Sequence, residues 1–239
     1  MVQDAFSSEP VESRPPRPSP VRDSVVLGAA VGVFGLTFGV LASESGLSVA
    51  QACAMSLLVF TGASQIAAVT VVGAGGGAIT AVASALLLAA RNGVYGLTLA
   101  SRLRVRGPRR AIAAQLIIDE STAMAVAQPD EAALTRAFWW TGLSVFVCWN
   151  TSTLIGALAG NAIGDPQTLG LDAAFPAGFI ALLAPQIRER PKLLAAVLGA
   201  GIAAAAVPLS RPGIPVLAAA FGAAIAFGSM RGKPTGGRP

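Results

Sequence analysis

Eight long apolar runs, separated by short charged loops, constrain this chain more than any other feature of its sequence. Each run is close to the ~20 residues that a helix needs to cross the hydrocarbon core of a bilayer. A soluble protein would have to bury every run, because monomers tolerate exposed apolar patches of only roughly a few hundred Å². Charged residues make up 12% of the chain, about half the share of an ordinary soluble domain. The sequence therefore predicts an all-α, polytopic membrane bundle.

The runs predict about six to eight transmembrane segments, since outer-membrane barrels alternate apolar and polar residues and these runs do not. The segments are expected near Ser24–Ala42, Ala50–Val72, Ala78–Ala100, Ala111–Gln128, Leu134–Gly160, Ala173–Ile187, Leu193–Pro208 and Ile214–Phe227. They form one transporter-like domain over residues 22–227. A Pro-rich tail (1–21) and a basic, Gly-rich tail (228–239) flank it, and their composition predicts disorder.

The positions of basic residues give the expected topology, since cytoplasmic loops carry an excess of Lys and Arg. The N-terminal tail, the loop Arg102–Arg110 and the loop Arg188–Lys192 are all basic, so all three are expected in the cytoplasm. Eight full crossings would put the first of these loops outside. The conflict disappears if the second and sixth segments are broken or re-entrant. These two contain, respectively, a polar motif at Thr61–Gln65 and the prolines Pro176 and Pro185. The alternative is that one loop violates the charge rule.

Glycines recur along one face of the first segment. Gly28, Gly32, Gly35 and Gly39 lie at spacings of four, three and four residues, which places them on the same side of a helix. Glycine lets two helix backbones approach closely in lipid. This face is expected to pack against another helix, either of this chain or of a partner.

Polar residues inside the apolar runs are the candidates for function, because ionisable groups at membrane depth are costly and face a partner or a cavity. In the third segment Arg91 and Asn92 interrupt the run, and Tyr95 follows one turn later. In the fourth, Asp119 shares an expected helical face with Gln115, and Glu120 points about 100° away. Arg91 is expected to pair with one of these acids. The pair is either structural or part of a substrate or proton site.

Other polar residues belong to the same set of candidates. Asn150 lies in a polar patch of the fifth segment, Gln186 follows Pro185 in the sixth, and Thr61, Gly62, Ser64 and Gln65 form the polar motif of the second. Broken segments in transporters expose backbone groups that bind substrate. The full set of predicted substrate-binding residues is Thr61, Gly62, Ser64, Gln65, Arg91, Asn92, Tyr95, Asp119, Glu120, Asn150, Pro176 and Gln186.

Composition argues against several other classes. The chain has no histidine, which removes histidine-based catalytic triads, HExxH zinc sites and histidine proton relays. Its two cysteines, Cys53 and Cys148, are far apart and lie inside apolar runs, as expected for small buried residues. The basic residues flank membrane segments, so they indicate topology and lipid contacts rather than nucleic-acid binding. No catalytic residue, metal or cofactor is expected.

Four stretches resemble a known family. They are LSVAQACAMSLLVFTGASQIAAV (47–69), ARNGVYGLTLASRL (90–103), DESTAMA (119–125) and LGLDAAFPAGFIALLAPQI (169–187). In this order they resemble the AzlC family, the large subunits of two-component branched-chain amino acid exporters. Ala89 and Asn92 stand where the family often has Asn and His, so specificity can differ here.

The resemblance implies export of branched-chain amino acids, or of methionine as in some members. It also implies a small AzlD-type membrane subunit as partner and a place in the cytoplasmic (inner) membrane. Such a substrate needs an anion for its ammonium group, which Asp119 or Glu120 can supply. It also needs hydrogen-bond donors for its carboxylate, from the amides near Gly62–Gln65 or from Arg91. The alternatives are a non-transporting assembly or receptor subunit and a transporter of another small amphiphilic metabolite.

Overall fold

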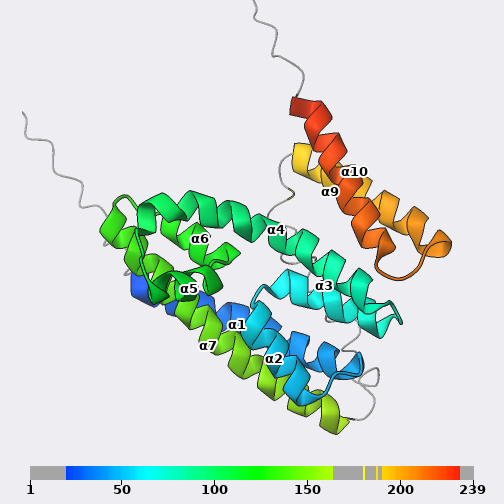
Figure 1. Ribbon diagram of the computed structural model, residues 1–239, viewed down its shortest axis with the longest axis horizontal. Coiled ribbons are helices and arrows are strands. Elements are labelled where there is room, and N and C mark those ends of the chain that lie inside the picture. Colours follow the sequence, from blue (N-terminus) through cyan, green and yellow to red (C-terminus); the bar gives the residue numbers. More distant parts are fainter. Residues whose placement is uncertain (1–19, 164–179, 181–186, 188–189, 232–239) are drawn as a thin grey trace, which may run out of the picture.

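The computed structural model describes residues 20–163, 180, 187 and 190–231 of the chain, and these parts are helical with no strand among them (Figure 1). The helices are α1 (Pro20–Glu44), α2 (Val49–Val59), α3 (Gly62–Gly73), α4 (Ala78–Leu103), α5 (Pro108–Gln115), α6 (Asp119–Val126), α7 (Glu131–Ile163), α9 (Arg190–Ala206), η3 (Val207–Leu209) and α10 (Ile214–Arg231).

Four helices among the described residues are long and apolar enough to span a membrane. They are Val21–Glu44, Ala78–Leu103, Glu131–Ala162 and Lys192–Leu209. The predicted all-α membrane bundle is therefore confirmed. The sixth predicted segment, with Pro176 and Gln186, and most of both tails lie outside the described residues. Helix α10 continues to Arg231, so the first residues assigned to the C-terminal tail are helical.

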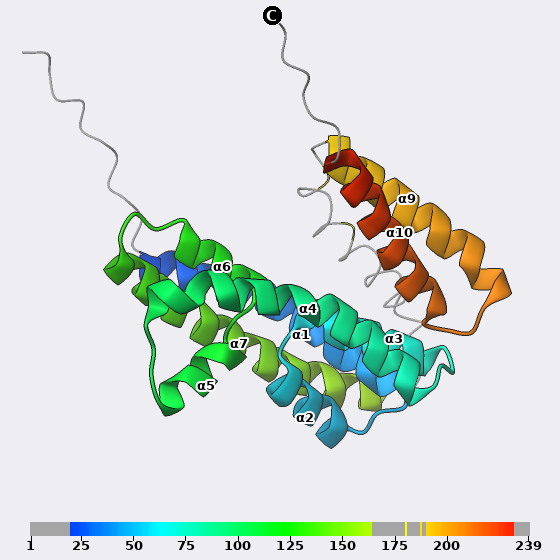
Figure 2. The same ribbon diagram turned by 45° about the horizontal axis from the view of Figure 1, so that its top comes forward.

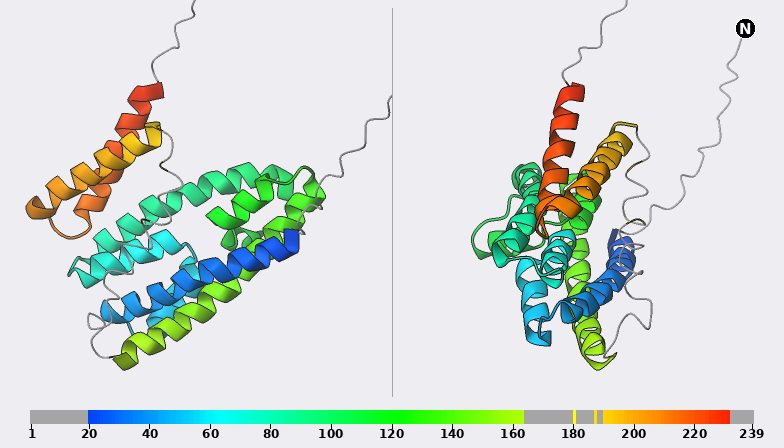
Figure 3. Two further views of the ribbon diagram at one scale, coloured as in Figure 1. Left: turned by 180° about the vertical axis from the view of Figure 1, so that it is seen from behind. Right: turned by 90° about the vertical axis from the view of Figure 1, so that its right-hand side faces the viewer.

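Helices α1 and α7 form the central pair of the bundle and run side by side along their length (Figure 3). A Cβ added at Gly28 would lie 2.7 Å from Ser144 Cβ, and one at Gly35 would lie 2.6 Å from the Trp149 carbonyl oxygen. Residue numbers rise together on both helices, so the pair is parallel. The predicted glycine face is thus confirmed, and an internal helix occupies it.

Side-chain hydrogen bonds fasten the same pair near its two ends. The hydroxyls of Ser24 and Thr141 lie 2.8 Å apart, and Ser43 Oγ donates to the Ala157 carbonyl at 3.0 Å. Buried hydroxyls inside a membrane need such partners, because lipid offers none. The α1–α7 pair is therefore a fixed frame for the shorter helices.

The second predicted segment is broken, as the sequence suggested. Helix α2 ends at Val59, Phe60 adopts a left-handed conformation (φ 40°), and α3 begins at Gly62. A Cβ on Gly73, at the end of α3, would lie 2.6 Å from Ser45 Oγ, next to the turn from which α2 begins. The α2–α3 hairpin therefore enters and leaves at the same end of the α1–α7 pair, which makes it re-entrant.

The fourth predicted segment is also broken, and here the expectation of one continuous helix was wrong. Helix α5 ends at Gln115 and α6 begins at Asp119. Gln115 and Asp119 consequently do not share a helical face. The hairpin returns to the end where it began, since Arg104 just before α5 is 3.2 Å from Glu131 at the start of α7.

This second break changes the direction of α7. One continuous fourth helix would have made the fifth segment antiparallel to the first, whereas α7 is parallel to α1. The start of α1, the basic loop Arg102–Arg110 and the start of α7 lie at one end of the molecule (Figure 1). The N-terminal Arg22 and the basic loop therefore share one side, as the charge pattern predicts.

Helices α9 and α10 form an antiparallel pair to one side of α3 and α4 (Figure 2). The turn between them touches the end of α3 and the start of α4. A Cβ on Gly76 would lie 3.1 Å from the Pro212 carbonyl oxygen. This turn thus lies at the end of the molecule opposite the basic loop.

Candidate functional site

The two re-entrant hairpins enter from opposite ends of the α1–α7 frame and meet near its middle. At the tip of α2–α3, the rings of Phe60 and Phe146 make an edge contact with centroids 4.8 Å apart. At the tip of α5–α6, Leu116 packs where a Cβ on Gly142 would come within 2.9 Å of it. Phe146 and Gly142 are one turn apart in α7, so both tips lie at the same depth.

A hydrogen bond joins the two tips directly. The Gln115 amide Nε2 donates to the carbonyl oxygens of Leu57 (2.9 Å) and Leu58 (3.3 Å) in the last turn of α2. Carbonyls in the last turn of a helix lack partners within the helix. Gln115, at the end of α5, therefore satisfies the end of a helix that belongs to the opposing hairpin.

The α5–α6 tip is held by its own side chains. The Ser121 hydroxyl accepts from the backbone N–H of Ile118 at 3.1 Å and donates to the Leu116 carbonyl at 2.6 Å. Asp119 and Glu120 occupy the first turn of α6, where carboxylates stabilise the positive end of the helix dipole. Sequence patterns missed this tip because Leu116, Ile117 and Ile118 continue the apolar run without Gly or Pro.

The predicted ion pair is present. The guanidinium of Arg91 lies 2.6 Å from the Asp119 carboxylate, and the Tyr95 hydroxyl interacts with the same carboxylate. Arg91 lies in the middle of α4, so the pair is at the depth of the two tips. Each side chain is about 40% exposed (40% for Arg91, 39% for Asp119). Glu120 and Asn92 are half-buried beside them.

The α2–α3 tip is built differently. Gln65 is fully buried, and its Nε2 donates to the Met55 carbonyl at 3.1 Å, which closes the gap between the two half-helices. The buried atoms Thr61 Oγ1, Ser64 Oγ and Gln65 Oε1 have no hydrogen-bond partner among the described residues. Buried polar atoms without a partner are rare in native structures, and here they gather at a break in mid-membrane.

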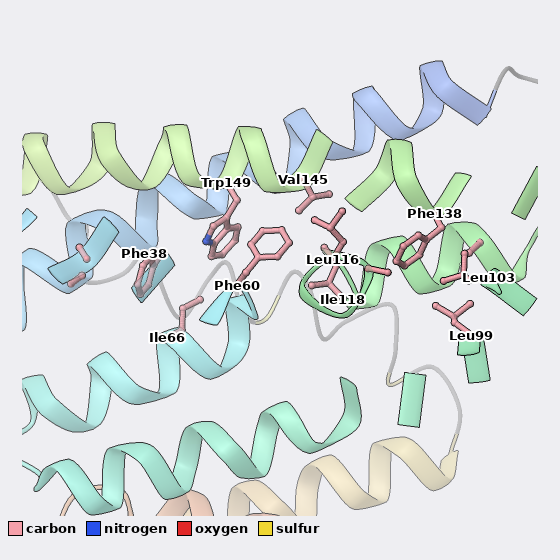
Figure 4. Close-up of a cluster of buried hydrophobic side chains, with 14 of the residues drawn as sticks. Phe38, Phe60, Ile66, Leu99, Leu103, Leu116, Ile118, Phe138, Val145 and Trp149 are labelled. Carbon is pink, nitrogen blue, oxygen red and sulfur yellow. The ribbon is translucent and has the colours of Figure 1, made fainter. Parts of the chain in front are cut away.

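Helix α7 adds two more buried polar atoms that have no hydrogen-bond partner among the described residues. Trp149 packs between Phe38 and Phe60 (Figure 4), and its ring N–H has no partner among the described residues. Asn150 donates to the Phe146 carbonyl at 2.8 Å, while its Oδ1 is buried without a partner. Sequence analysis singled out Asn150; Trp149 lay in the same polar patch but was not chosen.

Most of the predicted residues thus lie around the two tips or on α4 and α7 beside them. Thr61, Gly62, Ser64 and Gln65 form one tip, Asp119 and Glu120 the other, and Asn150 is on the wall that both tips share. Pro176 and Gln186 lie outside the described residues.

Comparison with known proteins places this chain in a family. The family model described as "AzlC protein" matches residues 26–163, which run from α1 through both hairpins to the end of α7. The chain belongs to the AzlC family. The matched region contains all of the site described above, so the opposed hairpins belong to the family's part of this chain.

Three relatives of this AzlC-family chain are curated as membrane proteins. An uncharacterized membrane protein of Archaeoglobus fulgidus is 32% identical over 68% of this chain and 72% of its own length. An uncharacterized membrane protein of Helicobacter pylori (strain ATCC 700392 / 26695) is 29% identical over 74% of this chain and 77% of its own length. Inner membrane protein YgaZ of Escherichia coli K12 is 26% identical over 79% of this chain and 84% of its own length. No solved structure matches the chain. These relatives support a role related to membrane transport.

Proposed function

We propose that this AzlC-family chain exports branched-chain amino acids across the cytoplasmic membrane, together with a small AzlD-type subunit. The observation that carries the proposal is the meeting of two re-entrant hairpins at mid-membrane, with polar groups at both tips. Irregular backbone at membrane depth persists where it lines a protein interior or a watery cavity. In secondary transporters, helix ends at such breaks bind the charged groups of the substrate.

The two tips offer the complementary groups that a zwitterion needs. The α5–α6 tip carries the acids Asp119 and Glu120, and only Asp119 has an ion-pair partner among the described residues. Glu120 is the group proposed to hold the substrate ammonium. The α2–α3 tip carries hydroxyls and helix N–H groups. A branched apolar side chain would lie among Val, Leu and Phe side chains of the core.

Flux measurements test this proposal. The full chain is reconstituted in liposomes with and without the small membrane protein encoded beside it, and efflux of radiolabelled leucine, isoleucine, valine and methionine is followed. Saturable efflux of the branched-chain amino acids that rises with the small subunit supports the proposal. Glu120→Gln should abolish that efflux, whereas Glu131→Gln, which removes an exposed acid outside the site, should leave it unchanged.

Two results would contradict the proposal. Absence of flux for all four amino acids, with both subunits present and folded, would favour a non-transporting assembly subunit. Full flux from the chain alone would contradict the dependence on the small subunit.

A further inference from the structure

The first turn of α3, like that of α6, has no side-chain cap, but unlike that of α6 it carries no acidic residue. The backbone N–H groups of Ser64 and Gln65 bond to the Thr61 carbonyl at 2.7 and 3.3 Å. The two preceding N–H groups, of Gly62 and Ala63, meet no acceptor among the described residues, and no side chain caps the helix. Two donors at the positive end of a twelve-residue helix are thus without an acceptor among the described residues.

Buried side chains at the same place supply a second, independent indication of a ligand. Ser64 is 1% exposed and Trp149 is 5% exposed, yet Ser64 Oγ and Trp149 Nε1 lack any partner within the described residues, as does Thr61 Oγ1. Leaving such a group unsatisfied is unfavourable in a protein interior. A hydroxyl can donate a hydrogen bond, and the indole N–H can only donate. An acceptor-rich ligand would satisfy all three.

Gly62 explains how the indole reaches the helix end. A Cβ at this position would lie 3.0 Å from Trp149 Cη2, so any larger residue would press against the ring. The ring is also stacked on Phe38, with centroids 6.2 Å apart. The six-membered ring of the indole is thereby held against the first turn of α3, and the unpartnered N–H lies on the adjoining five-membered ring.

The charges around the two tips decide which ligand group fits here. Neither an acidic nor a basic residue lies in the first turn of α3, whereas the first turn of α6 carries Asp119 and Glu120. Arg91, a cation at this depth, is already paired with Asp119 at 2.6 Å. An anion is therefore attracted to α3 and repelled from α6.

We infer that Thr61, Gly62, Ala63, Ser64 and Trp149 form a carboxylate subsite, which binds the carboxylate of the transported amino acid through two backbone and up to three side-chain donors. This inference rests on the proposed function, and it assigns the carboxylate to α3 rather than to Arg91. The substrate then lies across the two tips, with its ammonium group toward the acids of α6.

Binding to the purified full chain tests the subsite with three probes. L-leucine carries both charges, L-leucinamide lacks the carboxylate, and 4-methylpentanoate lacks the ammonium group. The double variant Thr61→Val/Ser64→Ala should weaken leucine and 4-methylpentanoate about tenfold or more, because two bonds to a charged group are lost. Leucinamide should bind weakly and equally to both proteins. Both substitutions remove hydroxyls that have no partner among the described residues, so the fold should be kept.

Two further variants separate the subsite from a general change in packing. Trp149→Phe keeps an aromatic ring but removes the N–H, and should weaken only the two carboxylate probes. Ser56→Ala is the matched control, since Ser56 is equally buried in the same hairpin but its hydroxyl already donates to Thr153 at 3.2 Å. It should leave all three affinities unchanged.

The outcomes distinguish the two proposals. Equal loss for leucine and leucinamide in the double variant, or no loss for either, overturns the carboxylate subsite while amino acid transport stands. Binding of 4-methylpentanoate but not of leucine by the unaltered chain overturns amino acid transport, and the same variants then still test the subsite. Binding of none of the probes overturns both.

Discussion

The two re-entrant hairpins perform the same structural task with opposite chemistry at their tips. In each hairpin the first half-helix enters the bundle and ends at the depth of the middle of α7. The second half-helix then returns to the end where the hairpin began. At the α5–α6 tip, Ser121 bonds to the Ile118 N–H and the Leu116 carbonyl, and the first turn of α6 carries two acids. At the α2–α3 tip, the donors of Thr61, Gly62 and Ser64 are left without partners among the described residues. The start of α6 carries carboxylates, whereas the start of α3 carries only uncharged groups.

The hairpins are also related by inverted topology. The α2–α3 hairpin precedes the long helix α4, and the α5–α6 hairpin precedes the long helix α7, but the two units enter from opposite ends of the α1–α7 frame. Inverted repeats of this kind in transporters place the substrate at the repeat interface near mid-membrane. The difference between the tips therefore lies where one substrate can touch both.

The sharpest test of the comparison is whether the hairpins enter from opposite sides. In a background with Cys53→Ala and Cys148→Ala, Ala74→Cys after α3 should react with an impermeant thiol reagent added outside. Arg106→Cys before α5 should be shielded, because basic loops face the cytoplasm. Arg190→Cys should be shielded for the same reason. Labelling of residues 74 and 106 from the same side would show that the hairpins do not oppose each other.

Removal of the Arg91 charge should have the next largest effect, and it should act on the α5–α6 tip. Arg91→Ala leaves Asp119 without its partner, and a lone charge at the centre of a membrane helix costs about 2.5–3.5 kcal/mol. The yield of folded chain and leucine flux should both fall severalfold. Arg91→Ala/Asp119→Asn should recover part of the loss, since residue 119 then carries no unpaired charge.

Arg104→Ala is the control for this prediction. It breaks an ion pair that is 73% and 53% exposed, and such pairs contribute about 0–1 kcal/mol. Thermal unfolding in detergent compares the variants. A double variant no better than the worse single one would mean that Arg91 and Asp119 act independently.

The sequence predicted the α2–α3 break but not the α5–α6 break, and the reason is physical. At Thr61–Gly62 a polar residue and a glycine interrupt the run, so the break is encoded locally. Leu116, Ile117 and Ile118 are fully compatible with continued apolar helix, and tertiary contacts produce the break. Leu116 packs at Gly142, and Gln115 bonds to α2. Neither contact can be seen without knowing which segments lie together.

The same distinction applies to the candidate site. The pairing of Arg91 with an acid of the fourth segment could be predicted from the free-energy cost of an unpaired charge in the membrane, because few countercharges are available at that depth. The orphan N–H of Trp149 did not follow, because a Trp in an apolar run has no periodic signature that shows whether its N–H is bonded. Its role depends on Gly62, which lies on a different helix and only approaches it in the folded chain.

Alanine substitution of one serine at each tip compares how much each hydroxyl contributes to stability, and the expected effects are smaller. Ser121 and Ser64 are both the third residue of a half-helix and both buried. Within the part of the chain that the structure describes, Ser121 has hydrogen-bond partners and Ser64 has none. Ser121→Ala should therefore cost about 1–2 kcal/mol of stability. Ser64→Ala should change stability by less than about 0.5 kcal/mol in the absence of substrate. Equal losses by thermal unfolding would show that Ser64 has a structural partner.

The smallest expected effect concerns the bond between the tips. Gln115→Met keeps the length of the side chain but removes the donor to the Leu57 and Leu58 carbonyls, which should cost about 0.5–1.5 kcal/mol. The cost should appear locally as faster hydrogen exchange of α3 residues 62–66, since the α2 end that supports them loses its bonds. Gln128→Met is the control, because the Gln128 side chain donates within its own segment, to the Met124 carbonyl. Faster exchange confined to α5 and α6 would contradict a role for Gln115 in the opposing hairpin and would leave the two tips in contact only through α7.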